Sequence, residues 1–472
     1  MALYLKQFSR HFVTTAAAVA VIAVVAIELL AGPWVKSFES HEVDATLHVL
    51  EKKELNKDVV VLGDSVGRGI FSGWRSGKGT VAMLACNQAT ETTGQYFFLK
   101  RYLEHNGMPG AVIICDRTPG KGDLNQALTE NYVQRCFTRW REILGLFRVK
   151  LDPVFTAKMV AYKLLATFKN RLHLQRTLVG FTNSDIYSGV VPASGTTPGG
   201  YGIFDVIEDE MRAARTESVS WRYLRQMLEE LDGLNIPVYY LPPVTTQKID
   251  DSHQLVQHSL AMFRDFERQF GGLHVLTDAY VRLPKSHFSD EVHLNELGLA
   301  AYRPLVQSRL DEIVQEAVDR RELNRDTAFA RGTPLFSYAD GKTLRMLRPV
   351  GTAAAVQGEA LQLSAATKDP ALLLPGLAGV EKPGQARVVV RVRMEGDSST
   401  VARLYYAAGD EDFAQQRSLR AKVGPGLNQV SFLLPADFQG GKLRFDPGEA
   451  EGRYVLHAVE GRIIAADDAV YF

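Results

Sequence analysis

Short apolar runs rich in β-branched residues alternate with helical stretches between residue 57 and about residue 320. The runs cover residues 59–62, 111–115, 238–241 and 273–276, and the helical stretches cover residues 95–105, 221–231, 254–270 and 295–310. Apolar strands separated by helices are typical of a parallel sheet that is covered on both faces. We therefore predict an α/β fold here, with chemically active side chains at the carboxyl ends of the strands.

Two short polar motifs flank this predicted sheet. Gly-Asp-Ser at residues 63–65 follows the first run, and Asp-Glu-Val-His at residues 290–293 precedes the last helical stretch. A serine hydroxyl becomes a useful nucleophile when a base takes its proton and a third group orients that base. Ser65, His293 and Asp290 are suited to these three roles. The alternatives are a plain turn at Ser65, a turn-capping His293 and an N-capping Asp290.

The two motifs together resemble the SGNH (GDSL-like) hydrolase superfamily, over roughly residues 57–310. The resemblance implies a three-layer, parallel-sheet domain. It also implies that Ser65 is the nucleophile, His293 the base and Asp290 the partner of that base. Negative charge that develops on the acyl oxygen must meet pre-placed hydrogen-bond donors, and the amide of Ser65 is one candidate.

The other blocks of the family are matched less closely. The second block carries a glycine whose amide serves the oxyanion hole, often two residues after an asparagine. Asn87-Gln88-Ala89 occupies this place, so the Ala89 amide would replace that of the glycine, and Asn87 is a substrate-binding candidate. The third block, Gly-x-Asn-Asp, is poorly matched after residues 111–115, where Arg117 or Asn125 would supply the donor.

Other side chains point to no metal or cofactor. Trp74 follows the nucleophile motif, where it either stacks on a sugar or is a loop aromatic that packs against the protein. His253 and His258 are not at metal-ligand spacing, and the three cysteines are too far apart for a zinc knuckle. We expect neither a metal ion nor a cofactor.

An apolar segment at residues 13–35 is long enough to cross a membrane. At about 1.5 Å per residue, about 20 helical residues cross a hydrocarbon core about 30 Å thick. Glu28 interrupts the segment near one end, and Lys6 and Arg10 precede it. The positive-inside rule then predicts a cytoplasmic tail at residues 1–12, a single anchor in the inner membrane and a periplasmic main body. A cleavable signal peptide is the alternative.

The rest of the chain is predicted to form a stalk and two domains. We expect a stalk at residues 36–56 and a catalytic domain at residues 57–325 with an insertion at about residues 137–215. The insertion includes a basic, apolar helix at residues 158–172 and a segment rich in glycine, serine, threonine and proline at residues 181–201. That segment is either a lid or a mobile surface loop.

The C-terminal part has a different pattern, with short alternating strands separated by turns. The predicted strands cover residues 387–393, 401–407, 429–434, 442–445 and 453–464. Short strands of this kind favour a β-sandwich. Residues 443–448 and 452–454 look like sandwich domains of bacterial cell-surface glycan enzymes, so a carbohydrate-binding domain is expected at residues 335–472.

The layout is similar to SGNH-like proteins that O-acetylate exported bacterial polysaccharides such as alginate. This resemblance implies a membrane-anchored O-acetyltransferase with a polysaccharide acceptor and an acyl donor that is relayed through a membrane partner protein. The alternatives are a carbohydrate or lipid esterase and a non-catalytic, glycan-binding subunit of an exopolysaccharide machine. No nucleic-acid partner is expected, because the 54 basic residues are balanced by 54 acidic ones.

Overall fold

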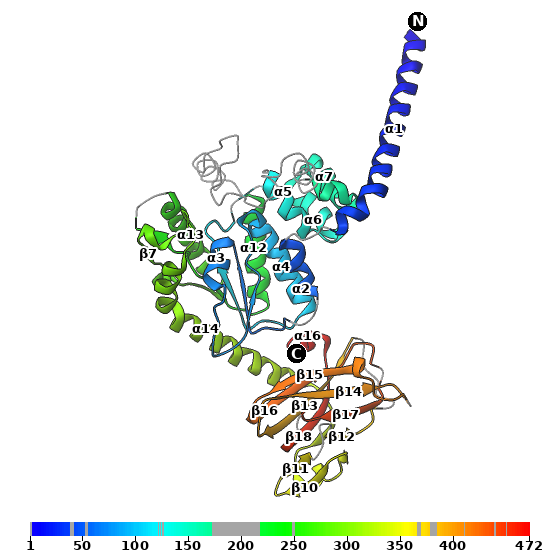
Figure 1. Cartoon of the computed structure of the whole chain (residues 1–472), viewed down its shortest axis with the longest axis vertical. Helices are drawn as coiled ribbons and strands as arrows, with labels where there is room; N and C mark the ends of the chain where they lie inside the picture. The colour runs from blue at the N-terminus through cyan, green and yellow to red at the C-terminus, as the bar shows by residue number, and fades with distance from the viewer. Residues whose placement is uncertain are drawn as a thin grey trace. The chain divides into compact units, whose positions relative to one another are not determined.

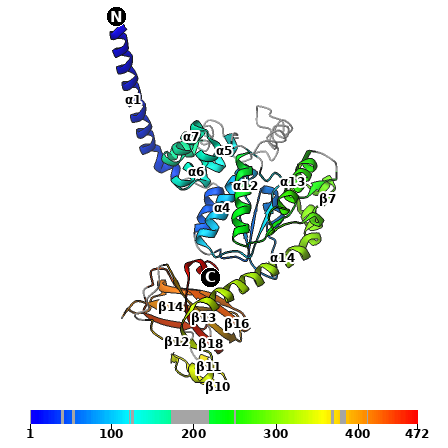
Figure 2. The same cartoon turned by 180° about the vertical axis from the view of Figure 1, so that it is seen from behind.

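The computed structural model divides the chain into two compact units, Met1–Val318 and Asp319–Phe472, which are described separately. Figure 1 shows their elements, and Figure 2 shows the same elements from behind. The structure describes residues 2–37, 42–51, 55–120, 122, 124, 127–171, 218–247, 251–365, 370–377, 385–409, 411–438, 440–449 and 451–472.

A five-stranded parallel sheet forms the centre of the first unit, in the order β2-β1-β3-β4-β6. The strands are β1 (Val59–Gly63), β2 (Val81–Met83), β3 (Ala111–Cys115), β4 (Val238–Tyr240) and β6 (Leu273–Val275). From β1 the chain adds β2 on one side and the later strands on the other. The order therefore reverses between β1 and β3, which is where open α/β sheets place their ligand sites. The predicted parallel-sheet α/β region is confirmed.

Alternate side chains of the strands enter two separate cores, because successive strand residues point to opposite faces. Val60 and Leu62 belong to one core, and Val59 and Val61 to the other. The first core is covered by α2 (Glu42–Glu51), α4 (Glu91–His105), α12 (Val219–Gly233) and α13 (Asp251–Glu267). The second core is covered by α3 (Ser65–Phe71) and α14 (Glu296–Arg331). The sheet is thus sandwiched between two helical layers (Figure 1).

The prediction of a stalk at residues 36–56 is wrong for the part of this range that the structure describes. Helix α2 buries Val43, Leu47 and Leu50 in the first core and packs against α4. The spacing of these residues places them on one helical face, so the segment behaves as an amphipathic core helix. Helix α14 also extends well past the predicted end at residue 310, because Ile313, Val314 and other apolar residues continue to pack on the sheet.

The expected insertion begins as a group of short helices. They are α5 (Ala127–Cys136), α6 (Trp140–Lys150), α7 (Pro153–Leu164) and α8 (Ala166–Lys169). The predicted single helix at residues 158–172 is therefore wrong, because the extended backbone of Leu165 separates α7 from α8. The glycine- and proline-rich segment at residues 181–201 lies outside the described residues.

Helix α1 (Ala2–Ser37) contains the apolar segment that the sequence singled out. Residues His11–Pro33 have a mean hydropathy of 2.4, and their most apolar stretch is not buried within the protein. By length and composition this segment is a candidate membrane span, and a signal sequence satisfies the same criteria.

Two antiparallel sheets form the second unit. One has the order β10-β11-β18-β13-β16, with β8 paired to β18, and the other has the order β15-β14-β17-β12-β9. Their strands are β8 (Thr333–Tyr338), β9 (Arg348–Val350), β10 (Ala353–Gln357), β11 (Ala360–Ala365), β12 (Ala371–Leu374), β13 (Arg387–Gly396), β14 (Thr400–Ala407), β15 (Ser418–Val423), β16 (Gly426–Leu433), β17 (Lys442–Asp446) and β18 (Gly452–Ile464). Val390 and Val392 of the first sheet share a core with Leu404 and Phe445 of the second. The predicted C-terminal antiparallel all-β region is confirmed.

Candidate active site

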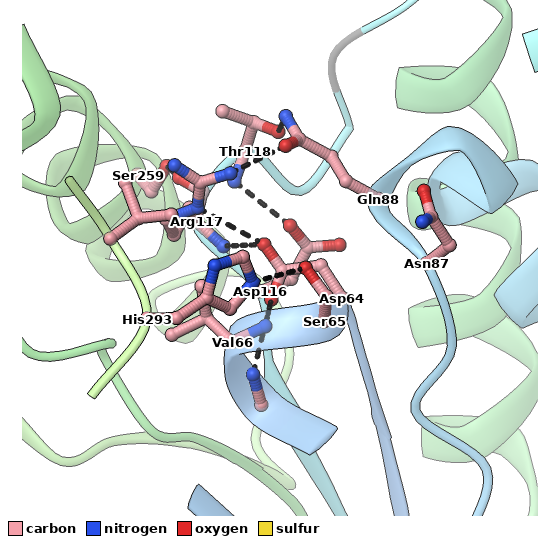
Figure 3. Close-up of polar contacts among 12 residues, drawn as sticks. Asp64, Ser65, Val66, Asn87, Gln88, Asp116, Arg117, Thr118, Ser259 and His293 are labelled. Carbon is pink, nitrogen blue, oxygen red and sulfur yellow. Dashed lines mark hydrogen bonds and ion pairs between the residues drawn. The ribbon is translucent and has the colours of Figure 1, made fainter. Parts of the chain in front are cut away.

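Ser65, His293 and Asp290 form a continuous hydrogen-bonded chain. Ser65 Oγ lies 2.8 Å from His293 Nε2, and His293 Nδ1 lies 2.7 Å from Asp290 Oδ2. Figure 3 shows the serine and the imidazole facing each other at the start of α3. The structure therefore brings Ser65 to a histidine and an aspartate that lie more than 220 residues later in the sequence.

The loop before α14 supplies both the imidazole and the carboxylate. Asp290 Oδ1 accepts the N–H groups of Val292 at 2.8 Å and His293 at 2.7 Å, while Oδ2 receives the ring. Burial raises the pKa of Asp290, but the hydrogen bonds from His293 and Val292 outweigh it and hold that pKa below its ordinary value. One carboxylate thus shapes the loop and orients the base.

The corner between β1 and α3 positions Ser65. Ser65 is the first residue of a helix and does not lie in a plain turn, and Asp64 caps that helix by accepting N–H groups from Val66 and Gly67. A Cβ at Gly63 would lie 2.0 Å from the carbonyl oxygen of Cys115, and one at Gly67 would lie 2.3 Å from the same atom. Both glycines are needed because the corner packs directly against the end of β3.

A buried polar cluster lies beside this corner, at the carboxyl end of β3. Arg117 Nε lies 3.3 Å from Asp64 Oδ2, and Arg117 Nη2 donates to Gln88 Oε1 at 2.5 Å. Asp116 accepts from the N–H of Thr118 at 2.9 Å and from the Gln95 amide at 2.5 Å. Figure 3 shows the contacts of Arg117 with Asp64 and Gln88.

Asp64 and Asp116 are both fully enclosed in this cluster. Burial, and then the nearby charge of Asp64, raise the pKa of Asp116, although the hydrogen bonds from Thr118 and Gln95 and the charge of Arg117 oppose this shift. Arg117 therefore pairs with Asp64, one of two neighbouring buried carboxyl groups at the edge of the site.

The candidate oxyanion donors differ in their hydrogen bonds and in their positions. Among the described residues, no hydrogen bond engages the Ser65 amide, which lies in the first turn of α3. The Ala89 amide, by contrast, donates to Asn87 Oδ1 at 2.9 Å within its own turn, so the prediction of a free donor there is wrong. Arg117 lies at the site, whereas Asn125 lies outside the described residues.

The two substrate-binding candidates lie away from the hydrogen-bonded chain or are already engaged. Asn87 caps the short helix η1 (Gln88–Thr90), and Figure 3 shows its side chain set apart from the Ser65–His293 contact. Trp74 donates from Nε1 to Gln307 at 2.8 Å and packs edge-on against Phe71. The alternative that Trp74 is a packed loop aromatic therefore describes the structure, since its ring contacts Phe71 of α3 and Gln307 of α14.

Sequence reasoning missed the supporting roles of Asp64, Gln88 and Asp116. For Asp64 a signal was available, because an aspartate between a strand and a helical stretch is a typical N-cap. Gln88 meets Arg117, and Gln95 meets Asp116, only because the fold brings separate segments together, which no local pattern encodes.

Among the described residues, no group of three or more His, Cys, Asp and Glu side chains is arranged to hold a metal ion. The cysteines Cys86, Cys115 and Cys136 are free thiols in the core, and burial raises the pKa of each. They are therefore poor nucleophiles and metal ligands.

No family model matches this chain, and no curated protein matches it. Among solved structures, the chain is similar to the xylan-binding domain CBM22-1 of Paenibacillus barcinonensis Xyn10C, with 18% identity and a TM-score of 0.23, over 29% of this chain and 97% of that one. It is also similar to BiXyn10A CBM1, with 8% identity and a TM-score of 0.20, over 29% of this chain and 94% of that one. At these TM-scores the likeness to carbohydrate-binding modules assigns neither a fold nor a ligand to this chain.

Proposed function

We propose that this chain is a membrane-anchored, extracytoplasmic serine O-acyltransferase of the SGNH type that acetylates a polysaccharide. The observation that carries the proposal is the chain of contacts from Ser65 Oγ to His293 Nε2 and from His293 Nδ1 to Asp290 Oδ2. This arrangement has the geometry of an activated nucleophile, with the base within hydrogen-bond reach and the third group orienting it.

The first half-reaction would form an acyl-enzyme. Ser65 Oγ attacks the carbonyl carbon of the donor while His293 Nε2 takes the hydroxyl proton, and the Asp290 carboxylate stabilises the resulting imidazolium. The oxygen that becomes negative would accept from the Ser65 amide and from the Arg117 guanidinium. The bond to the donor's leaving group then breaks, and His293 returns the proton to that group.

The second half-reaction would transfer the acyl group from Ser65 to a sugar hydroxyl. His293 takes the proton of the attacking hydroxyl, and the Ser65 oxygen leaves and recovers a proton from His293. The exposure of the site supports a large acceptor, because the side chains of His293 and Asp290 are 37% and 41% exposed. The polysaccharide acceptor, and an acyl donor delivered by a membrane partner protein, follow from the sequence resemblance.

The test uses the full-length chain in detergent with a chromogenic acetyl ester, with and without an oligosaccharide acceptor. Acetylation that depends on the acceptor supports the proposal, whereas release of acetate at the same rate without acceptor identifies an esterase. Ser65→Ala should lower either rate by about 10⁴-fold or more. Equal rates for the wild type and Ser65→Ala would favour the non-catalytic alternative.

A further inference from the structure

Helix α6 carries an apolar stripe on its outer side. Trp140, Leu144, Phe147 and Leu151, the residue that follows the helix, are 48%, 62%, 41% and 73% exposed. Their spacing of four, three and four residues places them on one face. The adjoining face holds the buried residues Ile143 and Leu146, so the helix is packed on one side and apolar on its exposed side as well.

The apolar surface continues onto α7, which packs against α6. Val154 and Leu164 are 67% and 62% exposed, while Phe155, Met159 and Tyr162 of the same helix are buried in the core. Six large apolar side chains from two neighbouring helices therefore face outward. We call this set of six residues the apolar platform; a soluble surface rarely concentrates apolar groups in this way unless they contact another phase or molecule.

Positive charge accompanies the apolar platform. Residues 139–171 include eight lysine and arginine residues but two acidic ones, whereas basic and acidic residues are equal in number over the whole chain. Arg148 is exposed on α6, with no ion pair to another described residue, whereas Lys158 on α7 is paired with Glu130. Apolar side chains next to lysine and arginine, with a tryptophan at the edge, are the combination that binds the interface of an anionic bilayer.

The candidate membrane span is joined to this group of helices. Glu28 of α1 accepts the N–H groups of Ala166 at 2.6 Å and Thr167 at 3.1 Å, and also the Thr167 hydroxyl at 2.6 Å. A Cβ at Gly32, one turn along α1, would lie 3.0 Å from Glu28 Oε1, so the glycine leaves room for the carboxylate. Figures 1 and 2 show α6 and α7 beside the C-terminal end of α1.

The contact between Glu28 and α8 determines how deep the helix group α6, α7 and α8 would lie in the bilayer. Glu28 precedes the end of the candidate span at Pro33 by five residues, or about 7.5 Å at 1.5 Å per residue. Interfacial helices bury their apolar faces by about 5–10 Å at the boundary between headgroups and acyl chains. The end of α1 and an interfacial helix group would therefore meet at the same level of the bilayer.

We propose that the apolar platform lies in the interface of the membrane that α1 spans, so that the first unit is held against the bilayer by α6 and α7 as well as by the anchor. The proposal rests on the membrane anchoring stated above. Its occupant is lipid, because the platform adjoins the span, lies at interfacial depth and has the exposed Arg148 beside it.

The experiment places a fluorescent label on single added cysteines of the full-length chain in vesicles of phosphatidylcholine and phosphatidylglycerol, with brominated lipids as quenchers. The native cysteines are at most 2% exposed, so they should not be labelled. Leu151→Cys reports on the platform, Val21→Cys on the anchor, and Leu305→Cys, 62% exposed on α14, is the matched control. Quenching at residue 151 should exceed that at residue 305 by about twofold or more.

The outcomes distinguish the membrane anchor at α1 from the proposed contact between the apolar platform and lipid. Strong quenching at residues 21 and 151 but weak quenching at residue 305 supports the platform. Quenching at residue 21, with residue 151 as weakly quenched as residue 305, overturns the platform while the anchor stands; this result would be expected if the stripe binds a protein instead. No quenching at residue 21 overturns the anchor and the platform together.

A charge variant gives a second readout. Arg148→Glu in the Leu151→Cys background should weaken quenching at residue 151, because one basic residue near an anionic surface contributes about fivefold to binding. Arg225→Glu on α12 is the matched control and should have no effect. Identical quenching for the two variants would contradict the electrostatic part of the proposal.

Discussion

Replacement of Asp290 by asparagine tests the proposed relay at the atom that orients the base. In the wild type, Oδ2 accepts from His293 Nδ1 at 2.7 Å, while Oδ1 accepts two backbone N–H groups. The asparagine oxygen can keep the two backbone N–H groups, but its NH₂ group then faces the ring. A donor at that position favours the tautomer with its proton on Nε2, which cannot accept the proton of Ser65.

The expected effects on activity and stability differ widely. A triad histidine held in the wrong tautomer loses about 10⁴-fold in kcat, which corresponds to about 5.5 kcal/mol of activation free energy. The free energy of unfolding should change by less than about 1 kcal/mol, because the Asp290 side chain is 41% exposed and its two backbone hydrogen bonds can remain. The variant should therefore be folded and nearly inactive.

The assay follows acetyl release from a chromogenic ester, alongside denaturant unfolding of each variant. Glu291→Gln is the matched control, because it removes a charge from the neighbouring position of the same loop, and it should retain wild-type activity. Ser65→Ala combined with Asp290→Asn should be no worse than Ser65→Ala alone, since groups that act as a unit are not additive. Activity of Asp290→Asn within tenfold of the wild type, with Ser65→Ala inactive, would refute the assignment of Asp290.

Three further predictions concern stability. Gly63→Ala should lower the free energy of unfolding by about 3 kcal/mol, because its Cβ would lie 2.0 Å from the Cys115 carbonyl oxygen; a thermal melt unchanged from the wild type would contradict the packing. Since the pKa of Asp290 is lowered in the folded state, the stability that its carboxylate contributes is present above the ordinary carboxyl pKa. That stability is lost as the pH falls through the pKa of the folded state. The stability gap between the wild type and Asp290→Asn should thus shrink from about pH 6 to about pH 3 in urea titrations, and a constant gap would argue against this linkage. Arg117→Met should cost about 2–4 kcal/mol in denaturant unfolding, because it leaves the buried Asp64 carboxylate without its cation; Arg117→Lys should recover part of the loss, and equal losses would show that charge is not the cause.

Much of the first unit could be predicted from local patterns. The run at residues 111–115 coincides with β3, and the other three runs lie within one residue of β1, β4 and β6. Apolar runs are readable because strands buried on both faces need apolar side chains at every position. The short strand β2 escaped prediction, because its three residues depend on pairing with β1.

The ends of helices, and the packing of the segment that was predicted as a stalk, were harder to predict. Val43, Leu47 and Leu50 have helical spacing, but a local pattern does not reveal the surface that such a face will contact. The same limit applies to α6, because its outward apolar stripe has the same spacing as a helix face that packs in a core. Whether an apolar face becomes core or surface depends on the elements that pack against it.

Local order along the chain was enough to indicate Ser65 at the end of the first strand, His293 and Asp290 in one later loop, a long apolar helix at the N-terminus and an all-β C-terminal part. These features depend on spacing and hydrophobic pattern over a few residues, which a sequence carries directly. Tertiary structure decided that Ser65 lies within hydrogen-bond reach of His293 and that Arg117 bridges Asp64 and Gln88. Each of these outcomes arises where segments distant in sequence meet at the ends of β1 and β3, because hydrogen-bond partners there are chosen by packing and burial.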